Sequence, residues 1–177
     1  WQCNHKFKGD QKCDTPHLTE DEIKQLYVSA ANKLIIDKDR LISGFALIKD
    51  TALDTTALQA ERDELQTEMQ VVSELMQQSI FENAHVALDQ AEYQKRYDGL
   101  VVRFDKAKAR LEAVTEQISD KQTRQATIEA FLADLQKQDV MVTEFSPTLW
   151  YSLADFITVY SRDDIRVTFK DGTEIQA

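Results

Sequence analysis

The chain has 177 residues and a formal net charge of −10 at pH 7, from 21 Lys and Arg against 31 Asp and Glu. A basic domain that coats nucleic acid is therefore not the first hypothesis, because binding to phosphates requires local positive charge. Only four Gly and two Pro interrupt the chain, so long helices are favoured over a β-sandwich or barrel. No run of about 18 apolar residues is present, and no membrane partner is expected.

The first 17 residues are polar and Lys-rich, and they contain both cysteines, Cys3 and Cys13. Two cysteines this close together suit a small disulfide loop or half of a metal site. A structural zinc ion needs four ligands, and His5 and His17 could complete a Cys2His2 set. The alternative is that Cys3 and Cys13 are the second pair of a zinc ribbon whose first C-x-x-C pair lies upstream. In that case no zinc is expected in this piece.

Two connecting helices are predicted over residues 18–53. The first covers about 20–36, because Thr19 and Glu22 form a T-x-x-E capping box before a helical apolar pattern. The second has Asp37 as its candidate cap. It follows from three apolar residues at helical spacing: Leu41, Phe45 and Ile48.

An antiparallel coiled-coil hairpin is predicted over residues 54–121, with its tip at about 81–90. The second arm repeats every seven residues over nearly four heptads, and such a repeat keeps one seam against a partner helix. The first stripe is less regular and runs on to Ile80. The predicted seam residues are Leu58, Leu65, Met69, Val72, Met76, Tyr93, Tyr97, Leu100, Phe104, Leu111, Val114 and Ile118. Two helices packed in an ordinary bundle are the alternative.

Charge supports the pairing of the two arms. Residues 54–88 carry seven acidic side chains and one basic side chain, Arg62, whereas residues 89–138 carry nine of each kind. Flanking charges of this sort select the partner and orientation more than they add stability.

The hairpin tip is a candidate protein-contact surface, because apolar residues occur there outside any expected core. Ile80 could instead seal the end of the hairpin locally. The candidate tip contacts are Ile80, Phe81, Val86 and Leu88.

Beyond the hairpin, residues 122–177 are predicted to form packing helices and a small β-hairpin. The seam meets two polar residues, Lys121 and Gln125, so the helix is predicted to bend or break near 121–126, leaving 127–138 to pack elsewhere. Ser146-Pro147 indicates the start of a short helix that reaches Phe156-Ile157.

Alternating residues near 158–160 and in 165–169 indicate strands. Asp171-Gly172 indicates a tight turn into residues 173–175. The expected fold class is therefore mainly α, with this small β-hairpin at the end of the chain.

No catalytic residues are assigned. The chain contains no G-x-S-x-G motif, phosphate loop, H-E-x-x-H motif or Gly-rich dinucleotide fingerprint. Most carboxylates are expected on solvated helix faces.

The beginning and the end of the chain resemble the large serine recombinases, which are the serine integrases and the transposon resolvase-like enzymes. Trp1 to Ile23, with Cys3 and Cys13, is similar to the second half of the recombinase zinc ribbon. The similarity continues through a long helical hairpin and therefore covers essentially the whole chain. The first Cys pair of the family is absent. The closing segment carries further matches at Phe145, Leu149-Trp150, Val159, Val167-Thr168-Phe169 and Asp171-Gly172-Thr173-Glu174-Ile175.

The resemblance implies a non-catalytic C-terminal piece of a site-specific recombinase for DNA integration or excision, with the catalytic serine domain elsewhere in the parent. Residues 1–17 would be a partial zinc ribbon, and 122–177 would include the β end of the zinc-ribbon domain. Zinc is implied for the intact parent and is not expected in this piece. The parent would be a cytoplasmic protein of a bacterium, phage or transposon.

The implied partners are other recombinase subunits, bound through the coiled coil, and attachment-site DNA. The coiled coil would control synapsis and directionality, with a directionality factor as a further candidate partner. The candidate DNA contacts are Lys6, Lys8 and Lys12, for which simple solubility is the alternative. The alternative for the whole chain is a generic antiparallel coiled-coil scaffold that recognises only protein.

Overall fold

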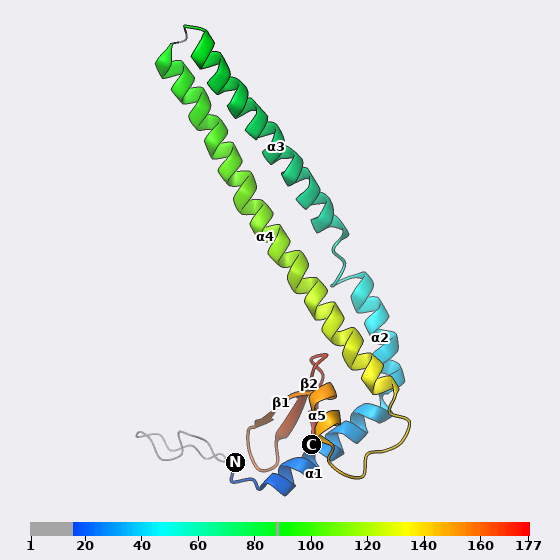
Figure 1. The fold of residues 1–177 in the computed structure, drawn as a ribbon. Helices are drawn as coiled ribbons and strands as arrows, with labels where there is room; N and C mark the ends of the chain where they lie inside the picture. The colour runs from blue at the N-terminus through cyan, green and yellow to red at the C-terminus, as the bar shows by residue number, and fades with distance from the viewer. Residues whose placement is uncertain (1–15, 88) are drawn as a thin grey trace, which may run out of the picture. The chain divides into compact units, whose positions relative to one another are not determined.

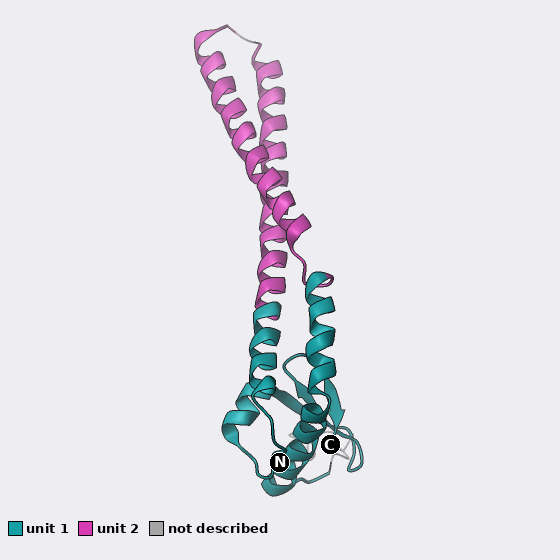
Figure 2. Ribbon diagram, turned by 90° about the vertical axis from the view of Figure 1, so that its right-hand side faces the viewer, with its two compact units in different colours: residues 1–50, 125–177 teal, residues 51–124 magenta. Residues whose placement is uncertain are grey.

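The computed structural model describes residues 16–87 and 89–177, which form five helices and a small antiparallel sheet (Figure 1). The chain divides into two compact units (Figure 2). One unit contains the described residues up to 50 together with 125–177, and the other is 51–124, close to the predicted hairpin range of 54–121. The longest helix contributes residues to both units.

Helix α1 (Glu20–Ile36) confirms the predicted first helix. Its capping box is complete, since the Glu22 N–H donates to Thr19 Oγ1 at 3.2 Å and the Thr19 N–H donates to Glu22 Oε2 at 2.7 Å. Its buried face consists of Tyr27, Ala30, Ala31, Leu34 and Ile35.

Helix α2 (Lys38–Asp50) confirms the second predicted helix. The Asp37 carbonyl accepts the Leu41 N–H at 3.2 Å, while the Asp37 carboxylate pairs with the guanidinium of Arg40. The predicted cap residue therefore stands at the start of this helix, and its side chain serves an ion pair.

Helix α5 (Pro147–Leu153) begins where the Ser-Pro pair predicted, with the Leu149 N–H donating to Ser146 Oγ at 3.3 Å. The prediction that it reaches Phe156-Ile157 is wrong, because strand β1 (Ala154–Val159) starts directly after it. The β-branched run Ile157-Thr158-Val159 favours a strand, and Ile157 pairs with Val167. Pairing with the next strand, beyond residues 160–164, decides the conformation here.

The three segments that the sequence indicated as extended all contribute a strand, so the sheet has one strand more than a simple β-hairpin. Strands β1, β2 (Ile165–Phe169) and β3 (Glu174–Gln176) are antiparallel in the order β1-β2-β3. The predicted Asp-Gly turn joins β2 to β3, and Gly172 has φ +92°, a left-handed conformation that favours glycine. The Thr173 N–H donates to Asp171 Oδ1 at 3.0 Å and completes the turn.

Aromatic and aliphatic side chains fill the core of this first unit. The Tyr27 ring meets the Trp150 ring edge-on at 4.9 Å and the Phe145 ring at 5.7 Å between centroids. Other fully or almost fully buried side chains are Leu34, Phe131, Leu135, Leu153, Val167 and Phe169.

The second unit is a helical hairpin. Helices α3 (Thr56–His85) and α4 (Gln90–Gln136) run antiparallel and side by side in both views (Figures 1 and 2). The Asp54 carboxylate accepts from the Thr56 N–H at 3.0 Å and from its hydroxyl at 2.6 Å, at the predicted boundary.

The predicted break near 121–126 is wrong, because α4 is continuous through this segment. Its residues include no Gly or Pro and are compatible with a helix. Lys121 Nζ donates to the carbonyls of Ala52 at 2.6 Å and Asp54 at 3.2 Å, and Gln125 Nε2 donates to Glu129 Oε1 at 2.9 Å. The polar residues Lys121 and Gln125 therefore make hydrogen bonds in place of apolar seam contacts, and the helix continues through them.

Candidate functional site

The predicted zinc and DNA-contact residues lie outside the described residues, and so does one tip residue. These are Cys3, Cys13, Lys6, Lys8, Lys12 and Leu88. The structure therefore places the hairpin seam and the rest of the tip, and the candidate site is built from them.

The twelve predicted seam residues all lie on helices α3 and α4. Each of them is buried or half-buried, and Val72 and Val114 are fully buried. The α4 residues keep the seven-residue repeat, so a single row of side chains faces α3 along the arm.

The α3 seam includes polar residues that the apolar stripe did not reveal. Its spacing alternates regularly between four and three residues once three polar positions are counted: Arg62, Ser79 and Asn83. Ser79 is only 4% exposed, whereas the adjacent Ile80 is 50% exposed. The seam therefore passes through Ser79, and counting the 4–3 spacing onward from Leu65 would have found it.

Ion pairs join the two arms along one side of the seam. Arg110 Nε lies 2.6 Å from Glu61 Oε1, and one heptad further Arg103 Nη2 lies 2.8 Å from Glu68 Oε2. Each arginine donates two hydrogen bonds to its glutamate. We call Glu61–Arg110 and Glu68–Arg103 the ladder.

The ladder sets the register of the hairpin more than its stability, since exposed ion pairs contribute little. Hydrogen bonds from Arg110 and Arg103 hold the pKa values of Glu61 and Glu68 below the usual range. Continuing the spacing places residue 75 opposite Arg96. That residue is Leu75, and Arg96 lies instead 3.4 Å from Glu82.

Side-chain hydrogen bonds close the tip of the hairpin. Asp89 Oδ1 accepts from the N–H groups of Ala91 at 2.9 Å and Glu92 at 3.1 Å, so Asp89 caps α4. Gln90 Nε2 donates to Asn83 Oδ1 at 3.0 Å across the turn. The tip is thus held by polar contacts and does not need its apolar side chains for closure.

The apolar side chains of the tip are exposed. Ile80 is 50%, Phe81 64% and Val86 56% exposed. The Phe81 ring stacks on the His85 ring with centroids 4.1 Å apart, and His85 Nδ1 lies 2.8 Å from the Phe81 carbonyl oxygen. Exposed apolar side chains gathered at the end of a hairpin are a candidate contact surface for a protein partner.

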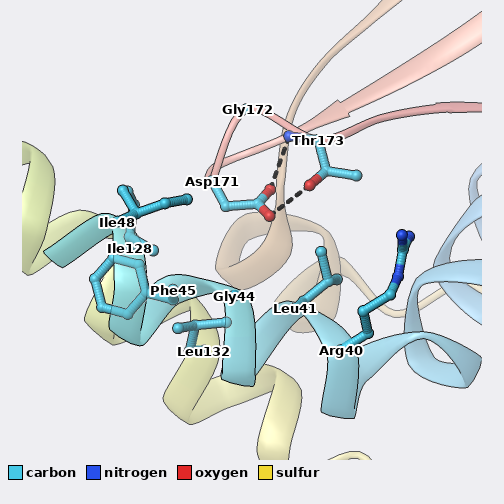
Figure 3. A pocket seen from close by; sticks show the side chains of 10 residues that line it. All are labelled: Arg40, Leu41, Gly44, Phe45, Ile48, Ile128, Leu132, Asp171, Gly172 and Thr173. Atoms are coloured by element: carbon cyan, nitrogen blue, oxygen red, sulfur yellow. Dashed lines mark hydrogen bonds between the residues drawn. The ribbon is translucent and has the colours of Figure 1, made fainter. Parts of the chain in front are cut away.

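A second candidate is a groove of about 440 Å³ in the first unit (Figure 3). Its apolar lining comes mainly from Leu41, Phe45, Ile48, Ile128 and Leu132. The polar groups on its rim have partners nearby, since the Asp171 carboxylate accepts from Thr173 and Arg40 pairs with Asp37. A ligand site normally presents convergent polar groups. In this groove the side chains of Asp171 and Arg40 are already bonded to Thr173 and Asp37, so the groove is a weaker candidate than the tip.

Within residues 16–87 and 89–177, no group of three or more His, Cys, Asp or Glu side chains is arranged to hold a metal ion. No described helix combines the length and apolar character needed to cross a membrane. No family model, curated protein or solved structure matches the chain.

Proposed function

We propose that this chain is the non-catalytic C-terminal region of a large serine recombinase, a site-specific enzyme of DNA integration and excision. The observation that carries the proposal is the exposed apolar tip, with Ile80, Phe81 and Val86, at the end of a helical hairpin whose turn is closed by polar hydrogen bonds. Through this tip the hairpin contacts other recombinase subunits and controls synapsis and directionality. The remaining unit contributes to binding attachment-site DNA.

The resemblance at both ends of the chain supports the DNA-acting part of this proposal. Residues 1–17 carry a net charge of +1, with Lys6, Lys8 and Lys12 against Asp10 and Asp14. The acidic remainder is compatible with the proposal, because a hairpin that binds protein does not require positive charge. Zinc belongs to the intact parent in this proposal.

A coiled-coil module that binds only protein is the second candidate, and ion pairing in the described chain favours it. Seven of the eight described arginines pair with carboxylates, so these side chains are less available to phosphates. The arginines in question are Arg40, Arg62, Arg96, Arg103, Arg110, Arg162 and Arg166.

Sequencing the reading frame that encodes the chain separates the two candidates. The recombinase proposal requires a serine recombinase catalytic domain and a C-x-x-C pair upstream of Trp1. A frame with neither of them contradicts the proposal and favours the protein-only module.

Replacement of Phe81 and Val86 by Ser tests the tip. We expect weaker self-association in sedimentation velocity and an unchanged helical signal in circular dichroism, because both side chains are exposed and lie outside the seam. Leu47→Ser is the matched control, since Leu47 is 69% exposed on α2. Loss of helical signal in the tip variant would assign these residues to the core and count against the tip contact.

A further inference from the structure

The side of the hairpin that carries the ladder also carries exposed apolar residues on α3. Positions three, four or seven residues apart share a side of a helix. Val71 lies three residues and Leu75 seven residues after Glu68, and they are 42% and 38% exposed. Leu75 occupies a flanking position that glutamate takes at the neighbouring heptads, Glu68 and Glu82. Apolar side chains thus replace charge on a solvent-facing flank.

The same side of α4 is basic and partly small. Lys106 lies three residues after Arg103 and four before Arg110, so it shares the side of both ladder arginines. One turn before Lys106, at the outer edge of this side, Val102 is 67% exposed. Gly99 lies seven residues before Lys106, and a Cβ built there would meet nothing within 4 Å. No contact with the described residues explains this helix-interior glycine, which costs about 1 kcal/mol relative to alanine.

The α3 half of this side is acidic and slightly hollowed. Glu64 lies three residues after Glu61 and four before Glu68, so it shares the side of both ladder glutamates. Lys106 has the same spacing from Arg103 and Arg110. A shallow hollow of about 400 Å³ is lined by Asp63, Glu64, Thr67, Glu68 and Val71. We call the side formed by Glu64, Val71 and Leu75 on α3 and by Gly99, Val102 and Lys106 on α4 the shaft face.

We propose that a second copy of this chain packs against the shaft face, with the two hairpins related by a two-fold axis parallel to their helices. This symmetry sets each α3 against the partner's α4 at the same height, and the contact is self-complementary. The inference deepens the proposed function, on which it rests, by adding the shaft of the hairpin to the surface through which subunits meet and by giving the symmetry of that contact.

The ladder register matches the groups that would meet. Because residue 103 is opposite 68 and residue 110 is opposite 61, Lys106 is level with residue 65 and Val102 with residue 69. Lys106 therefore comes within one residue of the level of Glu64, and Val102 within two residues of the level of Val71. In the two-fold arrangement, cation meets carboxylate and apolar meets apolar on both halves of the contact.

Complementarity within one chain favours a second copy over an unrelated partner. An unrelated basic helix would need only the acidic half of the shaft face, and an unrelated acidic helix would need only the basic half. Here both halves are present at one height, on one side, and with exposed apolar residues beside each. No ion pair of Lys106 or Glu64 occurs among the described residues, so both charges are available to a partner.

Charge reversal on the full chain tests the inference by sedimentation equilibrium. Lys106→Glu and Glu64→Lys should each raise the dimer dissociation constant by about tenfold, because like charges would then meet. The double variant should restore association, since the pair is re-formed with opposite polarity. Lys108→Glu is the matched control with the same charge change. Lys108 lies two residues before Arg110, on another side of α4, and should not alter association.

Equal dissociation constants for Lys106→Glu and Lys108→Glu would overturn the inference. So would a double variant as weak as the single ones, or a chain that stays monomeric over the whole concentration series. The Phe81 and Val86 variant in the same series reports on the tip separately. If only that variant weakens association, the shaft contact is wrong and the proposed function stands; if only Lys106→Glu and Glu64→Lys do so, the shaft contact stands and the tip contact is wrong.

Discussion

At the scale of single residues, Tyr27 shows how the core tolerates an unmatched polar atom. Its side chain is fully buried against Phe145 and Trp150, and its hydroxyl has no hydrogen-bond partner among the described residues. Burial also raises the pKa of Tyr27 well above the usual value. The ring supplies the packing at this position, and the hydroxyl adds a desolvation cost.

Tyr27→Phe should therefore raise the free energy of unfolding by about 1 kcal/mol near neutral pH, because it removes an unsatisfied buried hydroxyl. Denaturant unfolding followed by circular dichroism measures the change. Tyr151→Phe is the control, since Tyr151 is 74% exposed and should show no difference. A large loss of stability in Tyr27→Phe would mean that the hydroxyl makes a contact after all.

The same substitution has a consequence at alkaline pH. Above about pH 10 the unfolded chain releases the tyrosine proton while folded Tyr27, with its raised pKa, retains it. Stability of the wild type should therefore fall with pH in this window more steeply than stability of Tyr27→Phe. Parallel curves would contradict the buried, neutral state of Tyr27.

At the scale of elements, the hairpin depends on its seam. Phe104 lies in the regular repeat of α4 and is half-buried, and Val72 and Val114 provide fully buried positions on the two arms. The exposed ladder sets the register, while apolar burial in the seam supplies most of the stability.

Phe104→Ala should lower the free energy of unfolding by about 2 kcal/mol, below the range for fully buried aromatic residues because the ring is half exposed. Chemical denaturation of the full chain measures the loss. Glu112→Ala, at an exposed position of α4, should stay within about 0.5 kcal/mol of wild type. Equal stability of the two variants would show that the ring lies outside the seam.

At the scale of the whole molecule, carboxylates that are paired with arginines make stability sensitive to low pH. Several half-buried carboxylates have lowered pKa values because arginines donate hydrogen bonds to them. Glu61, Glu68 and Asp164 are examples. A lowered folded-state pKa contributes stability above the unfolded value, and this contribution disappears as pH falls through the folded value.

Thermal unfolding midpoints should therefore fall as pH decreases below about 4.3, the ordinary value for glutamate. The double variant Arg103→Gln with Arg110→Gln should show a smaller acid-induced decrease, because it removes the donors to Glu61 and Glu68. Arg124→Gln is the control with one lost charge outside the ladder. The same decrease in all three proteins would contradict a role of the ladder in acid sensitivity.

The local elements and the repeat of α4 were readable from the sequence, whereas the α3 seam was recovered only in part. Thr19, Glu22, Ser146 and Gly172 act on atoms within four residues, so their roles follow from short motifs. Ser79 was not predicted as a seam residue because a hydrophobicity pattern omits a polar residue, even one that the hairpin buries. Leu75 lies outside the same 4–3 spacing, so its exposure agrees with the count from Leu65.

The sequence by itself determined a mainly helical chain, the start of each capped helix, the heptad repeat of the second arm and the turn at Asp171-Gly172. Only the tertiary structure decided that α4 continues past Lys121, because that side chain finds carbonyl partners near residue 52. Only pairing of Ile157 with Val167 decided that the chain leaves the helix at Ala154. Local motifs depend on neighbours within a turn, whereas these outcomes depend on hydrogen-bond and packing partners that only folding brings within reach.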